Sequence, residues 1–561
     1  MKQGSVIKTL LFALTAVLLF ISAIQQRRQI WSFTPLTGVF VPTPKPKLSL
    51  ENCRTATYQT QMESYLKENI GFREPLIRFY NQYLFDFFKT SNNENIIVGK
   101  DGWLYFIQHV NEYYGKEAYR WHNSAEEAFE NFDREARLMW KLRGVLKDYG
   151  VDFFVFMAPQ KGFLYPEHLP RRDFAEVPIS AREYYSTLFD LYGFPYIEMT
   201  QWFIDLKKAD TLPYSLFPQT GAHWDFSAAL ATDSLMRFMG NLKGVKLPTL
   251  QFGPLHESSD ETKSTDYDIE SLANLIRPLP HPYDRLLDAE VTFTIDSTTT
   301  QPSAIFVGTS FLMRMYRFVP FSEIFPNSQY WYYNSLAYFG KDYKKMTYVN
   351  KLDILSELLE TDYVVWFTEG DQMCKASFGF VESTLVKLCF SDEQIEERRW
   401  QLADSLDVTY EQANELILKD PERYLPELAG DSIPAVRNIR IPEVLAIKEI
   451  KKDPKWIVTL RCQAAQQRIP IGDILKAEAQ NVLNNKPLMR DNTEVVSREN
   501  YVQSLVDDMV EEIRNKPELM AQIQEKANMG GMTLDEQLDT DARWIVNDQI
   551  QKGEIVLNVF E

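Results

Sequence analysis

The chain opens on one long apolar stretch. Residues 9–24 carry no charged side chain, and basic residues flank the run on both sides. A basic start followed by an apolar run of this length is typical of a secretory signal or a signal anchor. The boundary is a poor match to a small-residue cleavage site, so the sequence predicts an uncleaved transmembrane anchor over residues 1–30. The basic residues on both flanks leave its orientation open.

Three further segments follow the anchor. Prolines at alternate positions from Pro42 to Pro46 exclude helix and central strand, which predicts an extended stalk over residues 31–54. Apolar positions at helical spacing predict a helix over residues 60–88, with a break near Gly71 and Pro75. A turn then leads into a short aromatic strand that ends at residue 106.

The central part of the chain alternates between helical and strand-like patterns. Residues 125–149 have helical periodicity, and nearly uninterrupted apolar runs occupy 151–158, 303–308 and 363–367. Such runs are typical of parallel strands covered on both faces. The alternation predicts an α/β fold of the doubly wound kind, with flanking helices, over residues 55–390. The polar segment 254–300 is interpreted as an insertion.

Strand-like runs nearly vanish after residue 390, and charged helical segments recur. A repeat is visible at a constant offset: Ile450 to Pro454 is echoed by Ile513 to Pro517, and further matches follow downstream. The pattern predicts helix–turn–helix units in an all-α domain over residues 391–561. No constellation in this segment suggests chemistry, so we assign it a partner-binding or scaffolding role.

Composition narrows the classes of partner. The formal net charge of −18 argues against nucleic acid, because no basic phosphate-binding face is offered. The four cysteines form no CxxC pair, and no metal or cofactor motif occurs, so we predict no metal and no cofactor. Cys374 and Cys389 are spaced to close a short disulfide loop, or are ordinary core residues; both readings stay open.

Two segments place nucleophile chemistry in the α/β region. Gly308 ends a predicted parallel strand and Ser310 follows, which puts a hydroxyl beyond the carboxyl end of the sheet. A serine at such a turn can lie beside backbone N–H groups that hold an oxyanion, and Gly308 is the predicted position for this role. His223 lies at a loop-to-helix boundary and is the candidate base. The alternative for the turn at Ser310 is an ordinary helix cap, and the alternative for His223 is a half-buried histidine that packs beside Trp224.

Several short motifs occur in the same order as in a known family. They are residues 99–106, a Pro159-x-Lys161 segment followed by residues 165–170, His223-Trp224 and the strand that ends Gly308-x-Ser310. Together with residues 72–77, they resemble the alginate O-acetyltransferase family of SGNH-like proteins. The resemblance covers about residues 55–375.

This resemblance implies an SGNH-hydrolase-like, flavodoxin-like domain that acetylates an exported polysaccharide. Ser310 would carry the acyl group and His223 would be its base. A membrane-bound O-acyltransferase would supply the acetyl group. The implied location is the bacterial inner membrane, crossed once, with the bulk of the chain in the periplasm.

The chain departs from the family motif at two positions. Gly221 and Thr309 stand where the family has aspartates, and the first loss removes the group that orients the imidazole. Asp225 is the nearest substitute within the sequence, although its position also suits a helix N-cap. A Ser–His dyad, or an acid from elsewhere in the chain, remains open.

Four residues are candidates for binding the sugar. Lys161 follows a strand and could neutralise a uronate or an oxyanion, with a solvated surface lysine as the alternative. Tyr165 lies in a resembling motif. Tyr333 and Asn334 offer stacking and an amide donor, or belong to a buried edge strand.

The sequence therefore predicts a polysaccharide O-acetyltransferase or acetylesterase. The rival hypothesis is a catalytically impaired carbohydrate-binding or assembly protein that keeps the shape of the domain and has lost its chemistry with the change at Gly221.

Overall fold

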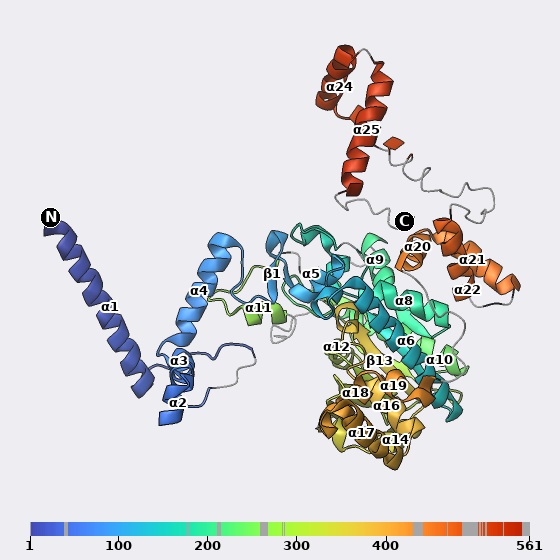
Figure 1. Cartoon of the computed structure of the whole chain (residues 1–561), viewed down its shortest axis with the longest axis horizontal. Helices are drawn as coiled ribbons and strands as arrows, with labels where there is room; N and C mark the ends of the chain where they lie inside the picture. Colours follow the sequence, from blue (N-terminus) through green and yellow to red (C-terminus); the bar gives the residue numbers. More distant parts are fainter. Residues whose placement is uncertain are drawn as a thin grey trace.

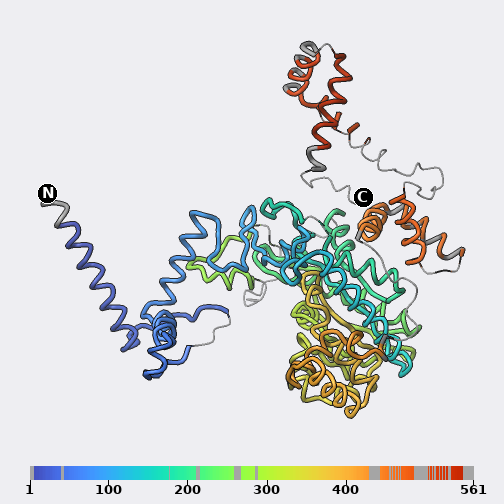
Figure 2. Tube along the Cα trace, viewed as in Figure 1, coloured from blue at the N-terminus to red at the C-terminus, as the bar shows by residue number. Residues whose placement is uncertain are grey.

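The structure is a computed structural model of the chain, shown in Figures 1 and 2. It describes residues 2–38, 43–175, 177, 179–209, 215–257, 267–282, 284, 287–429, 441–467, 469, 471–484, 503, 506–507, 509–510, 513–530 and 532–551. The central body is a seven-stranded sheet between two layers of helices, and the first and last helices extend away from it (Figure 1).

The sheet is mixed rather than wholly parallel. Its order is β12-β11-β10-β9-β13-β3-β4, and the five strands from β10 to β4 are parallel to one another, whereas β11 runs antiparallel to both of its neighbours. The strands are β3 (Asp152–Ala158), β4 (Tyr196–Glu198), β9 (Ala304–Gly308), β10 (Gln329–Tyr332), β11 (Leu336–Phe339), β12 (Lys345–Tyr348) and β13 (Tyr363–Glu369). The three apolar runs predicted as parallel strands are confirmed as β3, β9 and β13. β10 lies between β9 and β11, so its reading as an edge strand is wrong.

Both faces of the sheet are buried, which explains the uninterrupted apolar runs. In β3, Phe153 and Val155 face one hydrophobic core while Phe154 and Phe156 face the other. The first core is covered by α6 (Ala125–Asp148), α8 (Ala181–Tyr192), α14 (Ile354–Leu359), α15 (Gly370–Met373) and α16 (Phe380–Cys389). The second is covered by α7 (Lys161–Leu164), α9 (Thr200–Ala209), α10 (Ser227–Lys243), α12 (Phe311–Phe318) and α13 (Phe321–Ile324).

Small elements frame the carboxyl end of the sheet. β1 (Ile96–Val98) and β2 (Leu104–Phe106) form a hairpin that leads into α5 (Ile107–Tyr113). The segment interpreted as an insertion contributes β5 (Thr249–Phe252) paired with β8 (Val291–Thr294), β6 (His256–Glu257) paired with β7 (Leu287–Asp288), and α11 (Asp268–Ala273). α11 packs beside β2 and brings part of this segment to the site described below.

The N-terminal segment is a run of four helices. They are α1 (Lys2–Arg28), α2 (Leu50–Arg54), α3 (Thr57–Asn69) and α4 (Arg73–Phe88). Within α1, Val6–Arg28 has a mean hydropathy of 2.3 and its apolar 18-residue window is not buried, so the helix is long and apolar enough to cross a membrane. The predicted break near Gly71 is present, and it allows close packing: a Cβ at Gly71 would lie 2.1 Å from the carbonyl oxygen of Ser22 in α1.

The described C-terminal part is helical, as predicted. It comprises α17 (Asp392–Leu406), α18 (Tyr410–Lys419), α19 (Pro421–Tyr424), α20 (Ile441–Lys452), α21 (Pro454–Gln467), α22 (Ile471–Leu483), α24 (Pro517–Gly530) and α25 (Leu534–Gln551). α21 and α24 begin at the two prolines of the repeat. α20 to α22 share the core that α8 covers, while α24 and α25 have a cluster of their own. The domain boundaries remain predictions.

The cysteine pair is not bonded in this structure. Cys374 is a free, buried residue next to α15, and Cys389 is free and exposed at the end of α16. The disulfide reading therefore does not hold, and the reading of the pair as core residues holds for Cys374 and is wrong for Cys389.

Candidate active site

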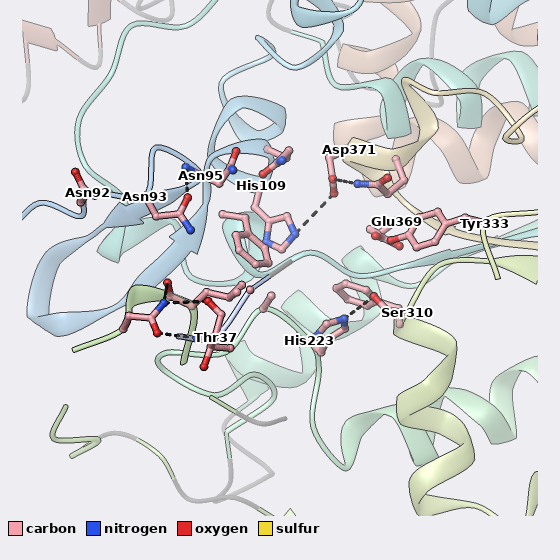
Figure 3. Close-up of a pocket in the computed structure, with 18 of the residues that line it drawn as sticks. Thr37, Asn92, Asn93, Asn95, His109, His223, Ser310, Tyr333, Glu369 and Asp371 are labelled. Carbon is pink, nitrogen blue, oxygen red and sulfur yellow. Dashed lines mark hydrogen bonds and ion pairs between the residues drawn. The ribbon is translucent and has the colours of Figure 1, made fainter. Parts of the chain in front are cut away.

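Ser310 lies where the central strand β9 meets α12. A Cβ at Gly308 would lie 2.2 Å from the carbonyl oxygen of Phe367, so only glycine lets β9 and β13 pair at this level. The chain then turns, and Ser310 occupies the position immediately before the first residue of α12. This turn carries the Ser310 hydroxyl out of the sheet and into a cavity at the carboxyl end of the strands (Figure 3).

His223 meets Ser310 across 87 positions of sequence. Its Nε2 lies 2.7 Å from Ser310 Oγ (Figure 3). The neighbouring Trp224 is fully buried, and its indole N–H donates to the carbonyl oxygen of Phe311 at 2.9 Å. This hydrogen bond ties the histidine loop directly to the start of α12, so the two side chains are held in register.

Asp268, the first residue of α11, supplies the acid that the sequence motif lacks. Its Oδ2 lies 2.7 Å from His223 Nδ1, and its Oδ1 accepts backbone N–H bonds from Ala222 at 2.7 Å and Ile269 at 2.9 Å. A carboxylate facing Nδ1 fixes the hydrogen on that nitrogen and leaves Nε2 free to accept a proton. Ser310, His223 and Asp268 thus have the arrangement of a nucleophile, its base and an orienting acid.

The electrostatics of Asp268 agree with that arrangement. Burial alone would raise the pKa of the Asp268 carboxyl, but the hydrogen bonds from His223, Ala222 and Ile269 outweigh burial and hold the pKa below its usual value. Asp268 is therefore ionised at neutral pH and can stabilise a positive charge on the His223 ring.

Sequence reasoning missed Asp268 and named Asp225 in its place. Asp225 is buried, 3.8 Å from the guanidinium of Arg314, while the His223 ring faces the cavity. Asp225 is not the cap of α10 either, because the helix begins at Ser227 and the residue at its N-cap is Phe226. Asp268 is 45 positions from His223, within the presumed insertion, and no short-range pattern marks it.

The cavity has a volume of about 590 Å³ and a largely polar lining. Two acidic residues line it close to Ser310: Glu369 at the end of β13 and Asp371 in α15, both almost fully buried (Figure 3). Burial and the neighbouring Asp371 raise the pKa of the Glu369 carboxyl well above its usual value. His109 lies across the cavity with Nε2 3.8 Å from Asp371 Oδ1, and burial lowers the pKa of its ring.

Three of the four predicted sugar-binding residues, Lys161, Tyr165 and Asn334, do not line the cavity. Lys161 is fully buried, and its ammonium donates to the carbonyl oxygens of Leu104 and Gln219 at 2.7 Å and of Gly221 at 2.8 Å. All three of its hydrogens are used, so Lys161 positions the loop before His223 and cannot neutralise a ligand. Tyr165 packs beside Trp103, its hydroxyl accepts from the Leu216 N–H, and it does not line the cavity.

Of the remaining predicted residues, Tyr333 lines the cavity and Asn334 and Gly308 do not. Tyr333 lines the cavity beside Ser310 (Figure 3), whereas the Asn334 side chain donates to the carbonyl of Phe378 and lies outside the lining. Gly308 is paired on both sides within the sheet, so it is wrongly placed to bind an oxyanion. At the start of α12, the Leu312 and Met313 N–H groups already donate to the carbonyl oxygens of Thr309 and Ser310. The Phe311 N–H, which directly follows Ser310, is therefore the better candidate.

Comparison with known proteins agrees with the resemblance expected from the motifs. Residues 96–323 match the family model described as "SGNH hydrolase-like domain, acetyltransferase AlgX". This part of the chain is an SGNH-like domain. No curated protein sequence matches the chain.

Three solved structures are similar at low identity. The O-acetyltransferase domain of Pseudomonas putida AlgJ is 13% identical, with a TM-score of 0.31, over 50% of this chain and 92% of that one. Bacillus cereus PatB1 is 12% identical, with a TM-score of 0.30, over 45% and 92%. Pseudomonas aeruginosa AlgX is 14% identical, with a TM-score of 0.28, over 49% and 61%. The family match therefore rests on residues 96–323 rather than on these overlaps.

Proposed function

We propose that the protein is a polysaccharide O-acetyltransferase that works through an acetyl-Ser310 intermediate. The observation that carries the proposal is the line of contacts from Ser310 Oγ through the His223 ring to the Asp268 carboxylate, each 2.7 Å long. The match of residues 96–323 to an acetyltransferase family supports the reaction class.

In the first half-reaction, His223 Nε2 takes the proton of the Ser310 hydroxyl as Oγ forms a bond to the acetyl carbonyl carbon of the donor. The Phe311 N–H at the start of α12 stabilises the oxyanion. As the carbon–oxygen bond to the donor breaks, the leaving oxygen takes the proton from His223, and acetyl-Ser310 remains.

In the second half-reaction, a sugar hydroxyl occupies the place of the leaving group. His223 accepts its proton, the sugar oxygen attacks the acetyl carbon, and Ser310 Oγ leaves and takes the proton back. Water in the same place would give hydrolysis and make the protein an acetylesterase. Throughout both steps, Asp268 stabilises the positive charge on the His223 ring.

The rival hypothesis, an impaired carbohydrate-binding protein, was motivated by the glycine at position 221. Asp268 supports the catalytic reading, since its carboxylate occupies the place that the missing motif aspartate would fill against Nδ1.

We further propose that α1 is a single-pass inner-membrane anchor that holds the bulk of the chain in the periplasm. A membrane-bound O-acyltransferase partner would then supply the acetyl group at the membrane surface. The exposed apolar surface of α1, and its close packing on Gly71 at the start of the folded chain, support a tether rather than a removable segment.

The test uses the full chain in detergent with p-nitrophenyl acetate as the acetyl donor. We expect a burst of p-nitrophenol and a mass increase of one acetyl group on the peptide that contains Ser310. The Ser310→Ala variant should show neither. If the wild type and this variant release p-nitrophenol equally, the acyl-serine mechanism is wrong.

A further inference from the structure

Carboxamide side chains are frequent in the lining of the cavity. Side chains of this type line it at Asn81, Asn92, Asn93, Asn95, Gln108, Asn274 and Gln372. Figure 3 shows Asn92, Asn93 and Asn95 gathered on the side of the cavity away from Ser310. Uncharged amides bind hydroxyl groups by neutral hydrogen bonds and give no net attraction to an anion.

Three of the residues that line the cavity, two carboxamides and one histidine, hold a buried polar atom without a hydrogen-bond partner in the described part of the chain. They are Asn81 Oδ1, Gln108 Oε1 and His109 Nδ1. The Asn81 amide nitrogen donates to the carbonyl oxygen of Ala273 at 2.8 Å, so the unpaired atom of this side chain is its oxygen, an acceptor. With the His109 hydrogen on Nε2, facing Asp371, Nδ1 is an acceptor too. These atoms need a ligand that brings donors, because buried polar atoms are costly to leave unpaired.

The fixed charge in the cavity is negative. Asp371 is 2% exposed and accepts hydrogen bonds from the neutral amides of Gln160 and Gln372, so no cation neutralises it directly. No lysine or arginine occurs among the described residues that line the cavity. Nearby, the Lys375 ammonium bonds to Gln372 Oε1, and the Lys161 ammonium is saturated by backbone carbonyls. A uronate would bring a second negative charge, and acceptors where donors are needed.

We propose that this cavity takes a neutral glycan as the acetyl acceptor, whose hydroxyl groups donate to the amide and imidazole acceptors, and that it excludes polyuronates. The proposal rests on the proposed function, in which a sugar hydroxyl must approach Ser310. The sequence analysis expected a negatively charged uronate to bind at Lys161, whereas this proposal has an uncharged sugar bind in the cavity.

The test is binding, which does not depend on acyl transfer. Full-length Ser310→Ala protein in detergent is titrated calorimetrically with mannuronate oligosaccharides and with their carboxyl-reduced counterparts, which differ only in the carboxylate. Neutral gluco- and N-acetylglucosamine oligomers of the same length complete the series. We expect at least one neutral oligomer to bind ten times more tightly than the mannuronate. Equal or tighter binding of the uronate, or no binding across the neutral series, overturns the proposal.

A pair of charge variants then locates the discrimination. Asp371→Asn should reduce the preference for neutral over uronate oligomers at least threefold. Asp404→Asn, an exposed residue on α17, makes the same change in net charge and should leave the ratio as it was. If both variants shift the ratio equally, the overall charge of the protein, and not the cavity, is responsible.

The outcome is separable from the proposed function. If acetyl-Ser310 fails to form while neutral oligomers still bind selectively, the mechanism is wrong and the class of ligand stands. If acetyl-Ser310 forms and the uronate binds better, the mechanism stands and the proposed class of ligand is wrong.

Discussion

Replacing Asp268 by asparagine is a direct test of the orienting acid. In the native site, Asp268 Oδ1 accepts two backbone N–H bonds and Oδ2 faces His223 Nδ1. In Asp268→Asn the remaining oxygen must keep both backbone bonds, because the opposite orientation would place the amide hydrogens against two N–H donors. The amide nitrogen therefore faces Nδ1 and donates to it.

The expected effect follows from that geometry. Turning the amide over would lose two hydrogen bonds of about 1 kcal/mol each, so the orientation is favoured by about 2 kcal/mol, or roughly thirtyfold. In this orientation the His223 hydrogen moves to Nε2, which can then no longer accept the Ser310 proton. The corresponding change in a serine protease lowers kcat by about 10⁴, which is about 5.4 kcal/mol of transition-state stabilisation. We expect a loss of about 10³ to 10⁴ here.

The assay is the acylation rate with p-nitrophenyl acetate, measured beside thermal unfolding. The matched control is Asp225→Asn, the same substitution at the carboxylate that does not contact His223, and it should retain activity within about tenfold. If Asp268→Asn stays folded and acylates at a rate within a factor of ten of the wild type, the assignment of Asp268 as the orienting acid is refuted.

Three further changes test the framework around the site. Lys161→Met leaves the buried carbonyls of Leu104 and Gly221 without a donor, at about 1 kcal/mol or more each, whereas that of Gln219 keeps the Leu104 N–H. We expect a loss of about 2 kcal/mol in the free energy of unfolding, measured by chemical denaturation, together with reduced acylation. Gly308→Ala would press a methyl group against Phe367, and we expect it to destabilise the sheet by about 2 kcal/mol or more in the same measurement. Burial would raise the pKa of Glu183, but Lys448 and Arg182 outweigh it and lower that pKa to about 2. The contribution of the Glu183 carboxylate to stability is thus complete above about pH 4.5 and is lost as the pH falls towards 2. The temperature of thermal unfolding should therefore fall through that window, and it should fall less in Glu183→Gln than in the wild type.

Local patterns were enough to find the framework of the fold. The apolar runs at 151–158, 303–308 and 363–367 are strands because they are buried on both faces, and burial on both faces is readable from composition alone. The break near Gly71 and the repeated helix starts at Pro454 and Pro517 were equally readable. The antiparallel strands β11 and β12 were not, since β11 is only partly buried and β12 is largely exposed, so neither carries the pattern of a strand covered on both faces.

The sequence by itself placed Ser310 beyond the carboxyl end of a buried parallel strand and marked His223, at a loop-to-helix boundary, as the candidate base. Only the tertiary structure decided that Asp268 is the acid that faces the imidazole, and that the Lys161 ammonium is buried on backbone carbonyls instead of facing a ligand. Asp268 reaches His223 across 45 positions, and Lys161 turns inward to bind three carbonyls from two other segments. The reason is physical: periodicity reports how a residue meets its own element, whereas the partner of a buried charge is set by where distant segments come together.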